Sequence, residues 1–173
     1  MKKIYFLHLL LLCFYVSTAQ NNTNVFEVAR KGTIEEAKQL LKANPKAFNV
    51  VNEEGFSPLT LACYRVNNEV AKLIIENGAD INHKSSSGTP LMASIVKGNN
   101  DMISFLLLKN ADVNLTDETG ITALMYAAMF KNKNAVMLLL QKKADKTKID
   151  AKGKTAFEYA VFSGQEEIIN LLK

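Results

Sequence analysis

The sequence holds few of the residues on which disulfide-stapled and metal-stabilised small proteins depend. Its 173 residues include only two cysteines, two histidines, three prolines and eight glycines, and no tryptophan. Apolar residues make up 48% of the chain. This composition excludes a disulfide framework and a chain too polar to form a core. It indicates one folded, mainly helical domain that is long enough to bury a core.

The segment 1–19 is expected to be a signal peptide. Lys2 and Lys3 precede an apolar run, Ile4–Val16, and Ser17 and Ala19 have the spacing of a signal-peptidase site. The run is too short for a membrane-spanning helix, which needs about 20 residues. We therefore expect an exported protein, periplasmic or secreted, with no stable membrane span once the leader is removed. An uncleaved anchor is the alternative.

Removal of this leader changes both the charge and the thiol content. The remaining chain has 19 basic residues, two fewer than the 21 of the whole sequence, against 17 acidic ones. This small excess, without a basic stripe, does not predict nucleic-acid binding. Cys63 is then the only cysteine, so no intrachain disulfide can form. Because it follows Ala62 on a predicted helix face, we expect a buried apolar thiol rather than a reactive one.

A short pattern recurs along the chain at a nearly constant spacing. Equivalent positions are held by Pro58, Pro90, Ala123 and Ala156. A fixed period of about 33 residues is typical of solenoids, in which a unit too small to cover its own apolar face is covered by its neighbours.

The sequence pattern of each unit predicts a glycine-containing turn followed by two short helices. A hydroxyl side chain stands where it can cap the first helix, at Ser57, Thr89, Thr122 and Thr155. A small residue follows on the inner side of that helix, at Ala62, Ser94, Ala127 and Ala160. The second helix ends at residues expected to adopt the left-handed conformation, Gly78, Asn110 and Lys143.

The sequence gives little support for an active site. It contains no HExxH, CxxC or GxSxG motif and no phosphate-binding glycine loop. His83 is the one histidine beyond the leader; it cannot form a metal site alone and is expected to be exposed and inert. Three aspartates recur at one turn position and are expected to bond loop backbone: Asp80, Asp112 and Asp145. We predict no enzymatic activity, no cofactor and no bound metal.

The repeated pattern resembles the ankyrin repeat family. The matching stretches are "GFSPLTLA…NGADIN", "GTPLMAS…NADVN", "GITALMYA…KADKT" and "GKTAFEYA…INLLK". The resemblance implies an all-α solenoid of stacked helix–turn–helix units with projecting β-hairpin-like loops. It makes residues 20–173 a single domain of about five units with degenerate terminal caps, approximately 22–51, 52–84, 85–116, 117–149 and 150–173. Two departures are the loss of Pro in the last two units and a turn before Pro90 that is one residue short.

In proteins of this kind the loop tips and the ends of the first helices line a concave face. The resemblance therefore places the function on this surface, as the binding of another protein. Aromatic, methionine and arginine side chains are enriched at the centres of interfaces. Candidate partner-binding residues at the matching positions are Phe56, Tyr64, Arg65, Val96, Lys97, Ile121, Met129, Phe130 and Phe162.

We hypothesise that these side chains form an apolar, basic groove for a segment of another protein that carries acidic and aromatic residues. The alternative is that they fold over their own neighbours, Phe162 above all. The predicted function is a non-catalytic protein-binding module outside the cytoplasm. Two other functions stay open: an assembly or protection factor for an exported enzyme, and an enzyme whose site the motifs do not reveal. The partner's identity and the oligomeric state do not follow from the sequence.

Overall fold

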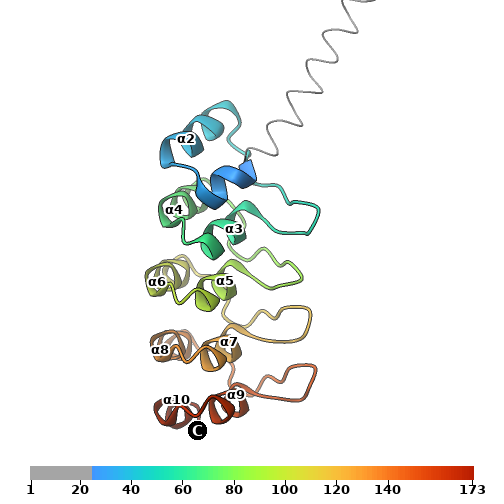
Figure 1. Ribbon diagram of the computed structural model, residues 1–173, viewed down its shortest axis with the longest axis vertical. Coiled ribbons are helices and arrows are strands. Elements are labelled where there is room, and N and C mark those ends of the chain that lie inside the picture. Colours follow the sequence, from blue (N-terminus) through green and yellow to red (C-terminus); the bar gives the residue numbers. More distant parts are fainter. Residues whose placement is uncertain (1–24) are drawn as a thin grey trace, which may run out of the picture.

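Pairs of short helices lie one above another in the computed structural model, which describes residues 25–173 (Figure 1). Within these residues the only β structure is two isolated bridges, Ser85–Gly88 and Thr116–Thr122. The predicted all-α repeat solenoid is therefore confirmed, while the predicted signal peptide lies outside the described residues. The helix pairs are residues 25–31 with α2 (Ile34–Ala43), α3 (Pro58–Arg65) with α4 (Asn68–Glu76), α5 (Pro90–Val96) with α6 (Asn100–Leu108), α7 (Ala123–Met129) with α8 (Lys133–Gln141), and α9 (Ala156–Ser163) with α10 (Glu166–Leu172).

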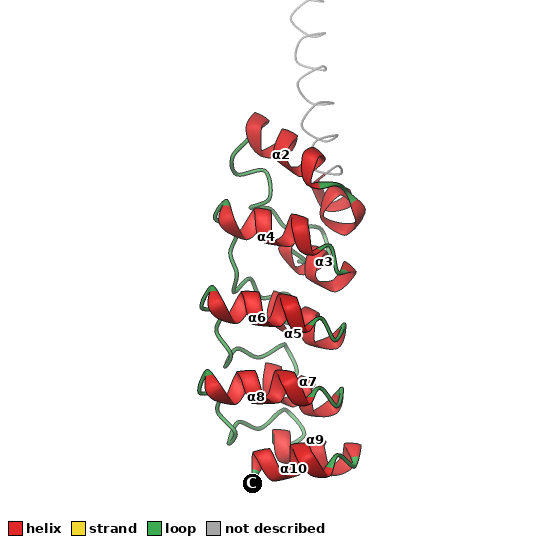
Figure 2. Cartoon of the chain, turned by 90° about the vertical axis from the view of Figure 1, so that its left-hand side faces the viewer, coloured by secondary structure: helices red, strands yellow, loops and turns green. Residues whose placement is uncertain are grey.

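The first helices of the pairs form one column and the second helices form another (Figures 1 and 2). In the first column α3 contacts α5, α5 contacts α7 and α7 contacts α9. The hairpin loops project to the side from this column, to the right in Figure 1. The loops and the first helices therefore share one long face of the stack.

The column of first helices is held together by small side chains at its contacts. Ala62, Ser94, Ala127 and Ala160 are all fully buried, as predicted. Small residues at these positions let neighbouring helices approach closely, and the leucines three residues earlier, such as Leu59 and Leu91, fill the space between them. The Ser94 hydroxyl donates a hydrogen bond of 3.0 Å to the Pro90 carbonyl, so this polar group is satisfied although it is buried.

The first helices begin at capping residues, largely as predicted. The hydroxyls of Ser57, Thr89 and Thr122 accept the backbone N–H three residues further on. Thr155 differs, because its hydroxyl and its backbone N–H both donate to the Glu158 carboxylate. The second helices end as predicted in left-handed residues, with positive φ at Gly78, Asn110 and Lys143.

Side chains of the hairpin loops connect consecutive units. The Asn82 side-chain oxygen accepts the Asp112 N–H at 2.8 Å, and the Asn114 oxygen accepts the Asp145 N–H at the same distance. The prediction for the recurring aspartates is confirmed, because each accepts the backbone N–H two residues ahead: Asp80, Asp112 and Asp145.

Candidate binding groove

A groove of about 490 Å³ crosses the first helices of four consecutive units. Four rings from two of these units lie along it: Phe56 and Tyr64 from the unit of α3, and Tyr126 and Phe130 from the unit of α7. The unit of α5 contributes smaller side chains. The full lining is Arg30, Phe56, Thr60, Leu61, Tyr64, Arg65, Ser87, Ala93, Val96, Tyr126 and Phe130.

The hairpin before α5 is shorter than its neighbours, and this shortening removes one side chain from the groove wall. The Ser85 N–H donates to the carbonyl of Gly88, three residues ahead, at 3.1 Å. In the other three hairpins the corresponding N–H reaches four residues ahead, as from Asp117 to Ile121. The residue missing before α5 is therefore the one that corresponds to Phe56 and Ile121. The α5 hairpin therefore has no counterpart to the Phe56 side chain in the groove wall.

A large side chain is also lacking one helical turn further on, at Ala93. Leu61, Ala93 and Tyr126 hold equivalent positions in consecutive units, and Tyr159 follows in the next unit. Ala93 has the smallest side chain of the four. The groove therefore opens above Ala93, between Leu61 and Tyr126.

The wall formed by Tyr126 is fixed in position. Its hydroxyl donates a hydrogen bond of 2.8 Å to the Asp117 carboxylate at the base of the hairpin. Its ring stacks with the Phe130 ring, with centroids 6.2 Å apart. Burial, followed by the bond to Asp117, raises the pKa of Tyr126 to about 12, so the hydroxyl stays protonated at neutral pH.

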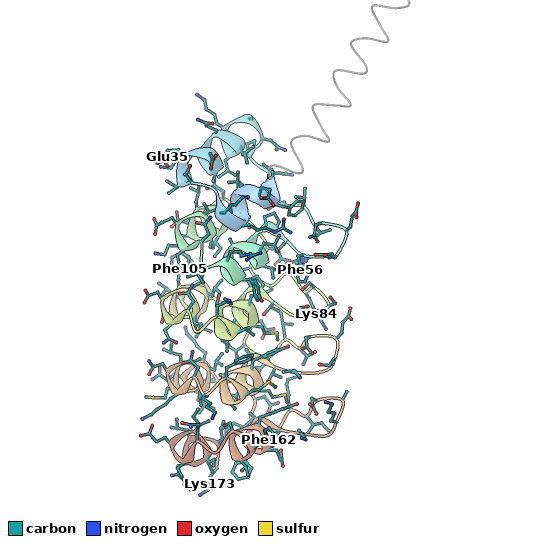
Figure 3. The ribbon with its side chains drawn as sticks, viewed as in Figure 1. Glu35, Phe56, Lys84, Phe105, Phe162 and Lys173 are labelled. Carbon is teal, nitrogen blue, oxygen red and sulfur yellow. The ribbon has the colours of Figure 1, made fainter. Side chains whose placement is uncertain are left out.

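The groove brings together five of the nine residues predicted to bind a partner: Phe56, Tyr64, Arg65, Val96 and Phe130. A sixth, Lys97, places its ammonium group 4.9 Å from the centre of the Tyr64 ring. Ile121 and Met129 are half-buried and do not line the groove. Phe162 lies on α9, apart from the groove, with 88% of its surface exposed (Figure 3). It is therefore not folded over its own unit.

Sequence reasoning missed several lining residues, some of which carry a readable signal. Leu61 precedes Tyr64 by three positions, and residues with this spacing share one face of a helix. The same spacing relates Ala93 to Val96, and Tyr126 precedes Phe130 by four positions, a spacing that also keeps two residues on one face. Arg30 carried no such signal, because it belongs to the degenerate first unit.

Positive charge predominates along the groove, and no carboxylate lines it. The Arg30 guanidinium donates to the Glu27 carboxylate at 2.9 Å, which offsets part of its charge. Arg65 and Lys97 are exposed and form no ion pair within residues 25–173. The acidic side chains of this face, Glu53, Glu54 and Glu118, gather with Lys84 around the hairpins instead.

The structure corrects the expectation for His83. Instead of being exposed, the ring is half-buried, and Nε2 donates a hydrogen bond of 2.8 Å to the Gly55 carbonyl. Stacking of consecutive hairpins brings this carbonyl within reach of the ring. In the described part of the chain no group of three or more His, Cys, Asp or Glu side chains could hold a metal ion. None of the helices described there is long and apolar enough to cross a membrane.

Cys63 is fully buried, as predicted. Burial raises the pKa of its thiol to about 12, so the thiolate that would be needed for nucleophilic chemistry does not form at neutral pH.

A sequence profile of three ankyrin repeats matches residues 25–117 and again residues 91–173. The chain belongs to the ankyrin repeat family. Ankyrin repeats generally mediate protein–protein interactions, and the family is generally not enzymatic.

Curated ankyrin repeat proteins resemble this chain over 58% of its length. They include "Ankyrin repeat and SAM domain-containing protein 6" of Rattus norvegicus, 31% identical over 102 residues. "E3 ubiquitin-protein ligase XBAT33" of Arabidopsis thaliana is 38% identical over 104 residues. A "Putative ankyrin repeat-containing protein" of Treponema pallidum (strain Nichols) is 30% identical over 102 residues. The matched parts make up 12%, 20% and 34% of these relatives, so the chain spans only a fraction of their length.

Proposed function

We propose that this ankyrin repeat protein is a non-catalytic binding module that works outside the cytoplasm and holds a segment of a partner protein in the groove between α3, α5 and α7. The observation that carries the proposal is the groove itself. It is a largely apolar hollow on the side of the stack where the first helices and hairpins meet.

The aromatic residues of the groove are more exposed than packing of the solenoid requires. Tyr64 exposes 46% of its surface and Phe130 exposes 47%, whereas Ala62 and Ala128 beside them are fully buried. Large, half-exposed aromatic rings beside cations are the composition of interface centres rather than of an inert protein surface. The packing of the repeats therefore does not account for these side chains, and the binding of a partner does.

Export is supported by the segment 1–19 of the sequence, with two lysines, the apolar run Ile4–Val16 and small residues at the cleavage position. Fractionation of cells that express the full chain tests this part separately. We expect the protein in the exported fraction, with a new N-terminus near residue 20. Recovery of the uncut chain in the cytosol would contradict export and leave the binding proposal standing.

Site-specific photo-crosslinking tests the groove. A photoreactive amino acid at Val96, inside the groove, is compared with one at Met137, an exposed position on α8 in the other column. We expect the same single protein to be crosslinked from position 96 and not from position 137. A partner that is crosslinked equally well from both positions would place binding elsewhere.

A matched pair of substitutions completes the test. Phe130→Ser removes a ring of the groove, and Met137→Ser removes a comparable exposed apolar side chain outside it. We expect Phe130→Ser to abolish the crosslink with little change in the melting temperature, and Met137→Ser to retain it. If the captured protein is an abundant exported enzyme in a one-to-one complex, the module serves as its assembly or protection factor.

A further inference from the structure

The groove combines an apolar opening with cations on one side. The opening lies above Ala93, where the next two units carry Tyr126 and Tyr159. An aromatic side chain at this position is therefore compatible with the stack, and its absence leaves a space that a ring from another chain fits. The walls of this space, Leu61 and Tyr126, are apolar or aromatic.

The charges that face this opening have a single sign. Arg65 is the last residue of α3, and Lys97 caps the end of α5 one unit further along, so both lie at the same edge of the stack. Neither has a carboxylate partner in the described chain. A carboxylate placed beside them gains two favourable interactions, whereas a second cation there is repelled.

We propose that the partner's binding segment is an extended peptide with one aromatic side chain, seated above Ala93, and a carboxylate one to three positions away, placed between Arg65 and Lys97. This inference rests on the proposed function and specifies the chemistry of its partner. The apolar opening supplies affinity for the ring, and the two cations select for the acid and set the direction in which the peptide lies.

The test is selection on the purified protein from an unbiased library of linear peptides of about a dozen residues, enough to cross two repeats as an extended strand. Selected peptides are synthesised with blocked termini, and their affinities are measured by fluorescence anisotropy. We expect the selected sequences to pair Phe, Tyr or Trp with a nearby Asp or Glu. Replacing that acid by its amide should weaken binding by about tenfold, and rising salt should weaken the acidic peptide more than its amide form.

Two protein variants place the peptide in the groove. Ala93→Phe fills the opening and should reduce affinity by at least about tenfold, while Ala43→Phe, at an exposed position on α2, should not. The double variant Arg65→Gln, Lys97→Gln should bind the acidic peptide as weakly as its amide form. Its control is Lys38→Gln, Lys142→Gln, which removes two exposed lysines elsewhere. The melting temperature of each variant shows that the fold is retained.

Selected peptides rich in Lys or Arg, or apolar peptides without an acid, would overturn the inference and leave the proposed function intact. Peptides that bind Ala93→Phe as tightly as the wild type do not occupy the opening and would overturn the inference. A library that yields no binder would overturn the inference alone, since the crosslinking test judges the proposed function. Self-association that is lost in both Ala93→Phe and Phe162→Ser would place a second copy in the groove, anchored by Phe162, and would also overturn the inference.

Discussion

The Tyr126 hydroxyl donates to Asp117 Oδ2 at 2.8 Å and so joins a helix to the hairpin that precedes it. The other oxygen of the same carboxylate accepts the backbone N–H groups of Thr119 and Ile121 at 2.8 and 3.0 Å. One side chain therefore shapes the turn and also positions a wall of the groove. Asp150 and Tyr159 repeat this arrangement in the next unit.

The Asp150–Tyr159 bond should make stability depend on acidic pH. The Tyr159 hydroxyl, followed by backbone N–H groups, lowers the pKa of Asp150 below its ordinary value of 3.8. The resulting stabilisation is present above pH 3.8 and is lost as the pH falls through the lower pKa of the folded state. At neutral pH we expect the wild type to have a higher melting temperature than the Tyr159→Phe variant. This difference in melting temperature should shrink below pH 3.8.

Thermal unfolding followed by circular dichroism across this pH range provides the measurement. Tyr64→Phe is the control, because the Tyr64 hydroxyl forms no hydrogen bond within the described residues. A difference between wild type and Tyr159→Phe that stays constant down to the lowest pH would contradict the assignment.

Gly88→Ala should destabilise the protein more than Gly98→Ala. Both glycines have positive φ, but a Cβ at Gly88 would overlap the Met92 sulfur, whereas a Cβ at Gly98 meets no atom within 4 Å. We expect a loss of about 1 kcal/mol in the free energy of unfolding for Gly98→Ala, from backbone strain alone. Gly88→Ala should cost about 2 kcal/mol more, because a buried side chain must also move. Urea denaturation measures both, and equal losses would show that the Met92 side chain adjusts freely.

Ala127→Leu should weaken the contacts between neighbouring first helices. Ala127 is fully buried on α7, so the added side chain forces the units apart and should cost about 1–3 kcal/mol of unfolding free energy. Ala43→Leu makes the same change at an exposed position on α2 and should shift stability by less than about 0.5 kcal/mol. The comparison uses urea denaturation under identical conditions. Similar midpoints for the two variants would mean that the stack tolerates wider spacing.

Cys63 should be unreactive in the folded protein. At pH 8 a pKa raised by burial from 9.0 to about 12 reduces the thiolate fraction at least about a hundredfold, and burial also blocks access. In a Cys13→Ser background, reaction with an aromatic disulfide reagent should be at least about a hundredfold slower in buffer than in denaturant. Rapid labelling of the native protein would show that the contact between α3 and α5 opens readily.

The predictable parts of this fold are those that depend on a few neighbouring residues and recur in each unit. Ser57 and Gly78 mark helix ends by their own backbone preferences, so their roles follow from a few neighbouring residues. Ala62 and its equivalents were predicted as buried because one small residue recurs at the same place in every unit. Periodicity shows that a position matters for stacking without showing which atoms it touches.

The parts that were missed depend on how consecutive units lie against each other. The hydrogen bond from His83 to Gly55 joins residues 28 positions apart, and the one from Asp112 to Asn82 joins residues 30 positions apart. The sequence around each residue does not indicate these bonds. The groove was anticipated from Tyr64 and Phe130, but its lining also includes Ala93, which the sequence did not single out. The small side chain of Ala93 does not by itself indicate a binding site. Its role is apparent only when the larger Leu61 and Tyr126 side chains are seen to line the same groove.

The shortened hairpin before α5 also has a consequence for how proteins of this kind diverge. A hollow lies here, where the hairpin is one residue shorter than its neighbours and where Ala93 holds the position of Tyr126 and Tyr159 in the next two units. The same two changes near α7, loss of the position held by Ile121 and Tyr126→Ala, would open a similar hollow one unit further along. The loss of one hairpin residue and of one ring can therefore reshape this face of the stack without any change of architecture.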